Sequence, residues 1–253
     1  MLKKMSKIDF HVIIPARYES SRLPGKPLAK IKGKEMILHV CERANLSGAK
    51  TVCVATDNIK IKTIVEKAGY TAVMTRDDHE SGSDRVYEAA EILGLSDKDI
   101  IVNVQGDEPF IPIENISQVA NIIVEKNANM STLCCTIDDE KEASNPNAVK
   151  VVFDKNNKAI YFSRSILPYV RSNIIDETSN FELGNHFRHI GIYAYKKHFL
   201  KQFIKWPISN LESLEKLEQL RALENGEAIY LDVLQDSPPS GIDTEEDLRI
   251  ANL

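Results

Sequence analysis

The sequence predicts an α/β fold with a doubly wound, mostly parallel sheet at its centre. Short and nearly continuous apolar runs alternate with segments of helical periodicity, and such runs are typical of strands that are covered on both faces. The runs are FHVIIPA, TVCVATD, TAVMT and IIVNVQGD, which begin at residues 10, 51, 71 and 100. Alternation of strands and helices favours parallel strands joined by crossover helices, as in Rossmann-like sheets.

Two early segments carry the helical pattern between these strands. In residues 35–48 the apolar side chains recur at helical spacing, and Gly48 follows as a C-terminal cap. Residues 58–69 repeat the arrangement and end at Gly69. Ligands of such sheets bind beyond the carboxyl ends of the strands, so the loops that leave those ends are the first places to search for a site.

The alternation of strands and helices is interrupted in the second half of the chain. Residues 149–163 predict a hairpin around Asn156 and Asn157, and residues 186–195 predict a strong strand. We interpret residues of about 145–195 as a β-rich insertion into a single domain of residues 1–253, which adds a substrate or subunit surface. Helix 209–226, strand 228–234 and a last helix opened by GIDTEEDL (residues 241–248) then return to the α/β pattern.

Composition excludes several classes of function. The 253 residues are 43% hydrophobic and 27% charged with a net charge of −5, so a basic field for nucleic-acid binding is absent. No run approaches the roughly 20 apolar residues of a membrane span, and the charged start does not resemble a signal peptide. The four cysteines show no C-x-x-C spacing and are interpreted as reduced core thiols of a cytoplasmic protein: Cys41, Cys53, Cys134 and Cys135.

A basic loop leaves the first predicted strand. It carries Arg17, Arg22 and Lys26 beside Gly25, but it matches neither a Walker A nor a G-x-G-x-x-G motif. Guanidinium groups can grip phosphate oxygens bidentately, an ammonium acts as a point charge, and glycine allows a close backbone approach. The loop therefore predicts a polyphosphate site, although a solvated cluster of charges is the common alternative.

Eight segments together resemble the 3-deoxy-manno-octulosonate (KDO) cytidylyltransferases, also called CMP-KDO synthetases, in order and over nearly the whole chain. These segments are VIIPARYESSRLPGKPL, VATD, NVQGDEP, NPNAVKVV, YFSR, RHIGIYAY, LEQLR and GIDTEEDL. The related sialic-acid cytidylyltransferases follow P-A-R with a Gly-rich stretch that this sequence lacks. The resemblance implies a fold of the nucleotide-sugar transferase type and the reaction of CTP with KDO to give CMP-KDO and pyrophosphate in lipopolysaccharide biosynthesis.

The resemblance also implies a CTP site. Lys26, Arg17 and Asp107 are the implied catalytic residues, and Arg22 is a less certain helper. The implied CTP contacts are Ala16, Arg17, Arg22, Gly25, Lys26, Ser81, Gly82, Arg85 and Gln105. Relatives often read S-G-T-E-R where this chain reads SGSDR, so Ser83 and Asp84 leave the cytosine contacts open.

Two aspartates are candidate Mg²⁺ ligands. Asp107 follows a strand end and a glycine, where a carboxylate can face a ligand, and Mg²⁺ needs hard oxygen ligands with phosphates and water completing its shell. A turn-capping role is the alternative for Asp107, and a helix-capping role for Asp243. The residues alone leave both alternatives open, and the resemblance implies that Asp107 and Asp243 bind the metal.

A third group of residues is implied to bind the sugar acid. Strand alternation places His189 on one face with Tyr193 and Tyr195, whereas His186 lies on the other face. Glu218 falls on the buried side of the predicted helix 209–226, where an ion pair with Arg221 is the alternative. The resemblance implies a sugar site formed by Arg164, His189, Tyr193, Glu218 and Gln219.

The residues alone leave two other function classes open. A nucleotide-binding regulator without catalysis would keep the basic loop but would not need the acidic pair. A small-molecule kinase would transfer the γ-phosphate and release a nucleoside diphosphate. The resemblance further implies a homodimer built partly through the insertion.

Overall fold

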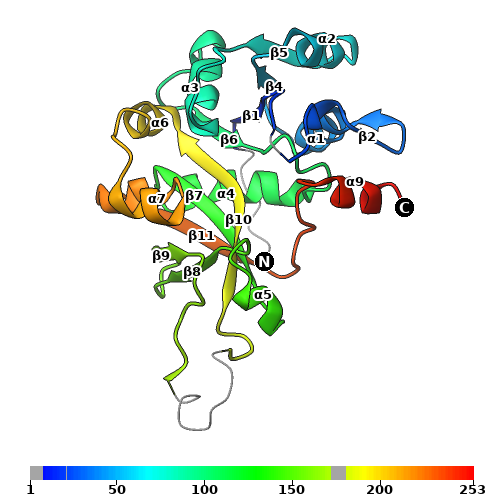
Figure 1. Ribbon diagram of the computed structural model, residues 1–253. Coiled ribbons are helices and arrows are strands. Elements are labelled where there is room, and N and C mark those ends of the chain that lie inside the picture. Colours follow the sequence, from blue (N-terminus) through cyan, green and yellow to red (C-terminus); the bar gives the residue numbers. More distant parts are fainter. Residues whose placement is uncertain (1–7, 21, 172–180) are drawn as a thin grey trace, which may run out of the picture.

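A mixed sheet forms the centre of the fold in this computed structural model (Figure 1). The structure describes residues 8–20, 22–171 and 181–253; the charged start of the chain and part of the predicted insertion lie outside these ranges. The described strands are β1 (Phe10–Ala16), β2 (Lys30–Ile31), β3 (Lys34–Glu35), β4 (Thr51–Thr56), β5 (Thr71–Met74), β6 (Ile100–Asn103), β7 (Met130–Thr136), β8 (Lys150–Phe153), β9 (Ala159–Ser163), β10 (Phe187–Lys196) and β11 (Ile229–Leu234).

The four strands predicted in the first half of the chain are confirmed, and they are parallel neighbours. The order along the sheet is β11-β7-β10-β6-β1-β4-β5. β1 pairs in parallel with β4 and β6, and β4 pairs in parallel with β5. The carboxyl ends of β1 and β6 therefore lie side by side, which places the loops that follow them at one edge of the sheet.

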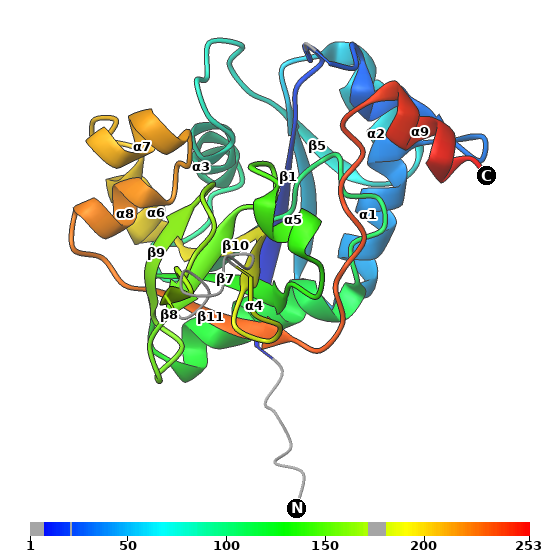
Figure 2. The same cartoon turned by 60° about the horizontal axis from the view of Figure 1, so that its bottom comes forward.

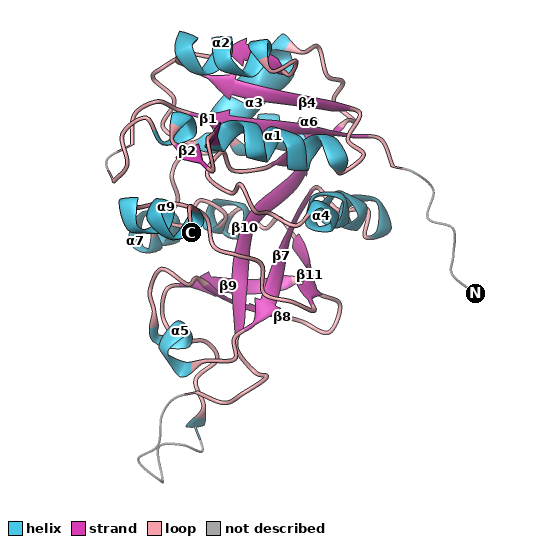
Figure 3. Ribbon diagram, turned by 90° about the vertical axis from the view of Figure 1, so that its right-hand side faces the viewer, coloured by secondary structure: helices cyan, strands magenta, loops and turns pink. Residues whose placement is uncertain are grey.

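The predicted hairpin is confirmed, but β10 differs from its interpretation as part of an insertion. β8 and β9 pair with each other, and Asn157 occupies the turn with a positive φ of 63°. β10 instead runs antiparallel between β6 and β7 in the middle of the sheet. Strand β10 thus belongs to the main sheet. Figure 3 shows β8 and β9 with α5 at the end of the molecule away from α2.

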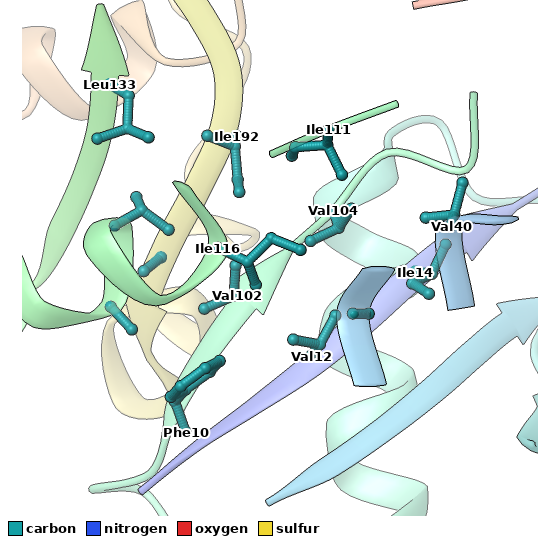
Figure 4. Close-up of a cluster of buried hydrophobic side chains, with 14 of the residues drawn as sticks. Phe10, Val12, Ile14, Val40, Val102, Val104, Ile111, Ile116, Leu133 and Ile192 are labelled. Atoms are coloured by element: carbon teal, nitrogen blue, oxygen red, sulfur yellow. The ribbon is translucent and has the colours of Figure 1, made fainter. Parts of the chain in front are cut away.

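Helices cover both faces of the sheet. They are η1 (Lys26–Leu28), α1 (Met36–Leu46), α2 (Ile59–Lys67), α3 (Gly82–Ile92), α4 (Ile113–Glu125), α5 (Glu140–Ser144), α6 (Lys197–Phe203), α7 (Asn210–Glu215), α8 (Leu220–Glu224) and α9 (Glu245–Ala251). Helices α1, α2 and α4 pack on one face, where Val12 and Ile14 meet Val40 and Ile116 (Figure 4). Helices α3, α6 and α8 pack on the other. In the described part of the chain, no helix has the length and apolar character needed to cross a membrane.

The cysteines are buried free thiols, as predicted. Cys134 packs in the core on the α3 and α6 side of the sheet, and Cys135 packs in the core on the other side. Strand β7 therefore presents these neighbours to opposite faces, as alternation along a strand requires.

The prediction of one continuous helix over residues 209–226 is wrong. The segment forms two short helices, α7 and α8, because Lys216 adopts a left-handed conformation with φ 54°. The predicted buried stripe is broken as well, since Leu214 is 72% exposed. The alternative ion pair between Glu218 and Arg221 is also wrong. Arg221 instead donates to both carboxylate oxygens of Glu212, at 2.8 and 2.6 Å.

The last helix returns to the first loop region. Thr244 and Asp247 form a capping box at the start of α9, as the TEED sequence predicts. The side chain of Asn252 accepts from the Lys32 N–H and donates to the Lys30 carbonyl. Figure 2 shows α9 beside α1. The segment before α9 is thereby held next to the basic loop.

Candidate active site

The basic loop after β1 folds back on itself around Gly25. Gly25 has a φ of 68°, a conformation that favours glycine, and its N–H donates to the Tyr18 carbonyl at 3.1 Å. The short helix η1 then begins at Lys26, and the buried Pro27 anchors it. This turn directs Lys26 back toward the edge of the sheet, while Arg17 and Arg22 stay exposed.

Lys26 joins two aspartates that lie far apart in the sequence. Its ammonium lies 2.5 Å from Asp107 Oδ2 and 2.8 Å from Asp243 Oδ1. Arg22 approaches the other oxygen of Asp243 at 3.2 Å. Burial alone would lower the pKa of Lys26, but the attraction of Asp107 and Asp243 outweighs it and raises that pKa. Lys26 is therefore a fixed cation between two carboxylates.

The capping alternatives are not the roles that the structure shows. The side chains of Asp107 and Asp243 face Lys26, and the cap of α9 is Thr244. The backbone N–H of Asp243 donates to Asp247 instead, at 3.0 Å. The carboxylate of Asp243 thus faces the site, where it pairs with Lys26 and Arg22.

Two glycines bring these segments together. A Cβ at Gly106 would lie 2.9 Å from the Pro15 carbonyl oxygen, and one at Gly241 would lie 3.2 Å from the Asp107 carbonyl oxygen. The Ile242 N–H donates to that same Asp107 oxygen at 2.8 Å. Glycine is needed at both positions because the backbone of one loop lies directly against the next.

Substitution of Gly106 should therefore disturb both stability and the site. Gly106→Ala forces backbone against backbone and is expected to cost about 1–3 kcal/mol of unfolding free energy. It should also lower activity, because Asp107 follows directly. Thermal melts check the first effect, with Gly82→Ala as control, since a Cβ there meets its nearest atom at 3.9 Å. A Gly106→Ala variant that melts like the wild type would contradict this account.

A cavity of about 290 Å³ opens above the end of β1, beside Lys26. It is bounded by the basic loop, by the N-terminus of α3 and by the loop after β6. The predicted residues in its wall are Ala16, Arg17, Arg22, Lys26, Ser81, Gly82, Arg85, Gln105, Asp107 and Asp243. Gly25 does not line the cavity, and it supports the loop instead. The structure thus assembles nearly all the predicted CTP contacts around one space.

Arg85 is held in place by side chains of the protein. Its guanidinium donates to Asp57 Oδ2 at 2.7 Å and to Thr75 Oγ1 at 2.6 Å, and its side chain is almost fully buried. Asp57 also accepts the backbone N–H of Tyr18 at 3.3 Å. Asp57 directly follows β4 and is not among the residues predicted from sequence. It links the basic loop to α3.

Ser83 and Asp84, the two residues at which SGSDR departs from the S-G-T-E-R of many relatives, do not line this cavity. Ser81 is the N-cap of α3, and Asp84 completes a capping box with it. Ser83 is buried and donates to Glu218 Oε2 at 2.8 Å. Ser83 and Asp84 therefore shape the start of the helix, whereas Ser81 and Gly82 face the cavity.

A second and wider cleft of about 870 Å³ lies on the other side of the acidic pair. Arg22 and Asp243 line both spaces, so the cleft adjoins the first cavity. Arg164 and His189 are the predicted sugar residues in its wall. Glu108, which the sequence analysis missed, also lines it. Burial, followed by the repulsion of Asp107, raises the pKa of Glu108 to about 7.

His189 and Tyr193 share one face of β10, as predicted. Their ring centroids lie 5.3 Å apart, and those of Tyr193 and Tyr195 lie 5.9 Å apart. Burial lowers the pKa of His189 to about 3, so the ring is neutral. His186 is directed elsewhere, with its Nδ1 at 2.9 Å from the Leu167 carbonyl.

Three of the predicted sugar residues carry unsatisfied polar atoms. Within the described residues, the Tyr193 hydroxyl, Glu218 Oε1 and Gln219 Nε2 are buried without a hydrogen-bond partner. Buried polar groups are ordinarily paired, so such atoms point to a ligand or to bound water. Arg164 differs, because its guanidinium already donates to the backbone carbonyls of Glu215 and Pro146, at 2.7 and 2.9 Å.

Comparisons with known proteins agree with this geometry. The sequence matches the cytidylyltransferase family over residues 11–229. It is 51% identical over 244 residues to a 3-deoxy-manno-octulosonate cytidylyltransferase of Pseudoalteromonas atlantica, covering 96% of each chain. A Haemophilus influenzae protein of the same name is 49% identical over 245 residues, again covering 96% of each chain.

A solved structure extends the similarity to three dimensions. It is described as CMP:2-keto-3-deoxy-manno-octonic acid synthetase complexed with CTP, and it superposes with a TM-score of 0.88. The two sequences are 39% identical, and the match covers 97% of each chain. Fold, site and sequence lead to one conclusion: the chain belongs to the cytidylyltransferase family of nucleotidyltransferases, among the 3-deoxy-manno-octulosonate cytidylyltransferases.

Proposed function

We propose that the chain transfers CMP from CTP to the anomeric hydroxyl of KDO, giving CMP-KDO and pyrophosphate for lipopolysaccharide biosynthesis. The observation that carries the proposal is Lys26, held between Asp107 and Asp243 where two cavities meet. The hydroxyl oxygen bonds to the α-phosphorus, and the bond from that phosphorus to the oxygen bridging the β-phosphate breaks. Pyrophosphate leaves with the electron pair of that bond, and the hydroxyl proton is released to solvent.

The first cavity suits the triphosphate. Arg17, Arg22 and Lys26 supply positive charge, and Gly82 in the first turn of α3 brings a backbone N–H to the same wall. Phosphoryl transfer depends mainly on positioning and on the stabilisation of charge that spreads over phosphoryl oxygens. Fixed cations along this wall would serve both needs.

Asp107 and Asp243 would hold Mg²⁺. Among the described residues, no cluster of three or more His, Cys, Asp or Glu could by itself bind a metal ion. Two carboxylates nevertheless fit, because the Lys26 ammonium bridges them and thus stands where a cation is stabilised. Mg²⁺ commonly takes one or two protein carboxylates and completes its shell with phosphate oxygens and water. When bound, it would neutralise charge on the triphosphate.

The second cleft suits the sugar acid. Thr132 Oγ1 donates to backbone carbonyls of β10 and lies 3.0 Å from His189 Nε2. With the single Thr132 proton on one of these carbonyls, Nε2 of the ring donates to the Thr132 oxygen. A neutral ring then leaves Nδ1 as an acceptor for a sugar hydroxyl. Arg164, in the same wall, would supply a further contact. Tyr193, Glu218 and Gln219 lie outside that wall, and their contacts with the sugar acid rest on the resemblance.

His189→Ala should impair the use of KDO much more than the binding of CTP. Loss of one hydrogen bond to the sugar is expected to raise the KM for KDO about tenfold. Steady-state kinetics measure that KM, and calorimetry measures the affinity for CTP. The exposed His198 on α6 gives a matched control, His198→Ala. Equal weakening of both substrates would instead indicate a structural histidine.

One assay tests the whole proposal. Purified protein is incubated with CTP, KDO and Mg²⁺, and the release of pyrophosphate is measured. A kinase would release CDP without pyrophosphate, and a regulator without catalysis would release neither. Product formation that requires both substrates supports the proposal, and release of CDP would overturn it.

We further propose a cytoplasmic homodimer that associates through the region of residues 145–195. Four buried free thiols favour a reducing compartment. Within the described residues β9 pairs with β8 alone, and its Ile160 is 62% exposed, so this edge offers apolar surface. Sedimentation of the wild type and of Ile160→Glu tests the interface, since the charge should shift a dimer toward monomer.

A further inference from the structure

Ser83 connects the helix turn beside the first cavity to Glu218, one of the predicted sugar residues. It lies in the first turn of α3, is 1% exposed, and donates from Oγ to Glu218 Oε2 at 2.8 Å. Glu218 lies 135 positions later, in the turn between α7 and α8. Ser81 and Gly82, the two residues before Ser83, line the cavity assigned to the triphosphate.

The surroundings of Ser83 fix the direction of this hydrogen bond. A carboxylate oxygen only accepts, so the single hydroxyl proton of Ser83 goes to Glu218. The Tyr195 hydroxyl lies beside Ser83 and Asn103 and can donate to the Ser83 oxygen. The hydroxyl proton of Ser83 is thereby used, and the side chain is 1% exposed, so Ser83 acts on Glu218 and not on a ligand.

Glu218 has one oxygen held and one oxygen open. Oε2 accepts from Ser83, while the buried Oε1 has no hydrogen-bond partner within the described ranges. A carboxylate with one anchored oxygen cannot rotate freely, and the direction of the second oxygen is fixed. Side chains that contact a ligand are commonly held in the right orientation by a hydrogen bond from a second residue that does not contact the ligand.

We propose that Ser83 is a positioning residue that anchors Glu218 through Oε2 so that Oε1 is presented to a hydroxyl of the sugar acid. The inference rests on the proposed function. Because Ser83 belongs to the turn of α3 that faces the nucleotide, it sets the sugar contact relative to the triphosphate.

The test compares substitutions at Ser83 by steady-state kinetics. Ser83→Ala removes the anchor and is expected to raise the KM for KDO about tenfold, with the KM for CTP changed less than twofold. Ser83→Thr keeps the hydroxyl and should restore the wild-type KM. Ser83→Cys nearly keeps the size of the side chain but replaces the hydroxyl with a weakly donating thiol. It therefore tests the loss of the hydrogen bond to Glu218 if the alanine variant does not fold. CTP affinity, measured by calorimetry, should be the same in all four proteins.

A matched control and a double-mutant cycle separate positioning from packing. Ser131 is also buried, and it donates to the Val119 carbonyl at 2.7 Å on the α4 side of the sheet, so Ser131→Ala loses a comparable bond without affecting KDO. In a Glu218→Gln background, Ser83→Ala should change the KM for KDO less than twofold. The same tenfold effect in that background would overturn the inference, as would equal changes in both KM values. A wild type that releases no pyrophosphate would instead overturn the proposed function.

Discussion

Lys26→Ala is expected to lower turnover by about 10²–10³-fold, because it removes a charge fixed at the point where the triphosphate and the acidic pair meet. Its ammonium is the group that contacts both Asp107 and Asp243. Steady-state release of pyrophosphate measures the loss. The sheet and its core do not involve this side chain, so circular dichroism should show an unchanged fold.

Two further variants sharpen this prediction. Lys30→Ala removes an exposed lysine four positions later and should leave turnover unchanged. Lys26→Arg keeps the charge but replaces a compact ammonium with a larger, planar guanidinium, so its turnover should lie between those of Lys26→Ala and the wild type. Near-normal turnover in Lys26→Ala would reject a catalytic role for Lys26.

Asp107→Asn and Asp243→Asn should each reduce activity by two or more orders of magnitude. Each change removes a negative ligand and nearly preserves the shape of the side chain. In whatever activity survives, the magnesium concentration needed for half of the maximal rate should rise. Stability should fall by about 1 kcal/mol or less, because both partners of the ion pair are partly exposed to solvent. Magnesium titrations and thermal melts measure the two effects.

The control for the acidic pair is Glu245→Gln, an exposed acid in the first turn of α9. It should change neither the magnesium dependence nor turnover. If the aspartate variants melted well below the wild type and kept the wild-type magnesium dependence, both residues would be structural and the metal assignment would fail.

The parts of this site that could be predicted from sequence lie at strand ends. Residues at the carboxyl ends of parallel strands must share an edge of the sheet, so the loops after β1 and β6 could be placed together from periodicity alone. Asp243 could not be placed in this way. It follows an irregular segment after β11, and its position depends on Gly241 lying against Asp107.

The break between α7 and α8 could not be predicted from local sequence. Leucines spaced by three continue through the segment, and Lys216 at the break is neither glycine nor proline. The left-handed turn is stabilised by distant contacts, since Arg164 donates to the Glu215 carbonyl and Arg221 pairs with Glu212. Tertiary contacts thus override propensity there. The central place of β10 depends on long-range pairing in the same way.

The bond between Lys26 and Asp243 joins residues that are 217 positions apart. At ribosomal rates of about 5–20 residues per second, Asp243 is synthesised roughly 10–40 s after Lys26. Among the described strands, β11 ends only nine positions before Asp243, so the last strand and the second aspartate become available almost together. The catalytic centre is therefore complete only when the whole chain has been made and the segment before α9 docks onto the loop after β6.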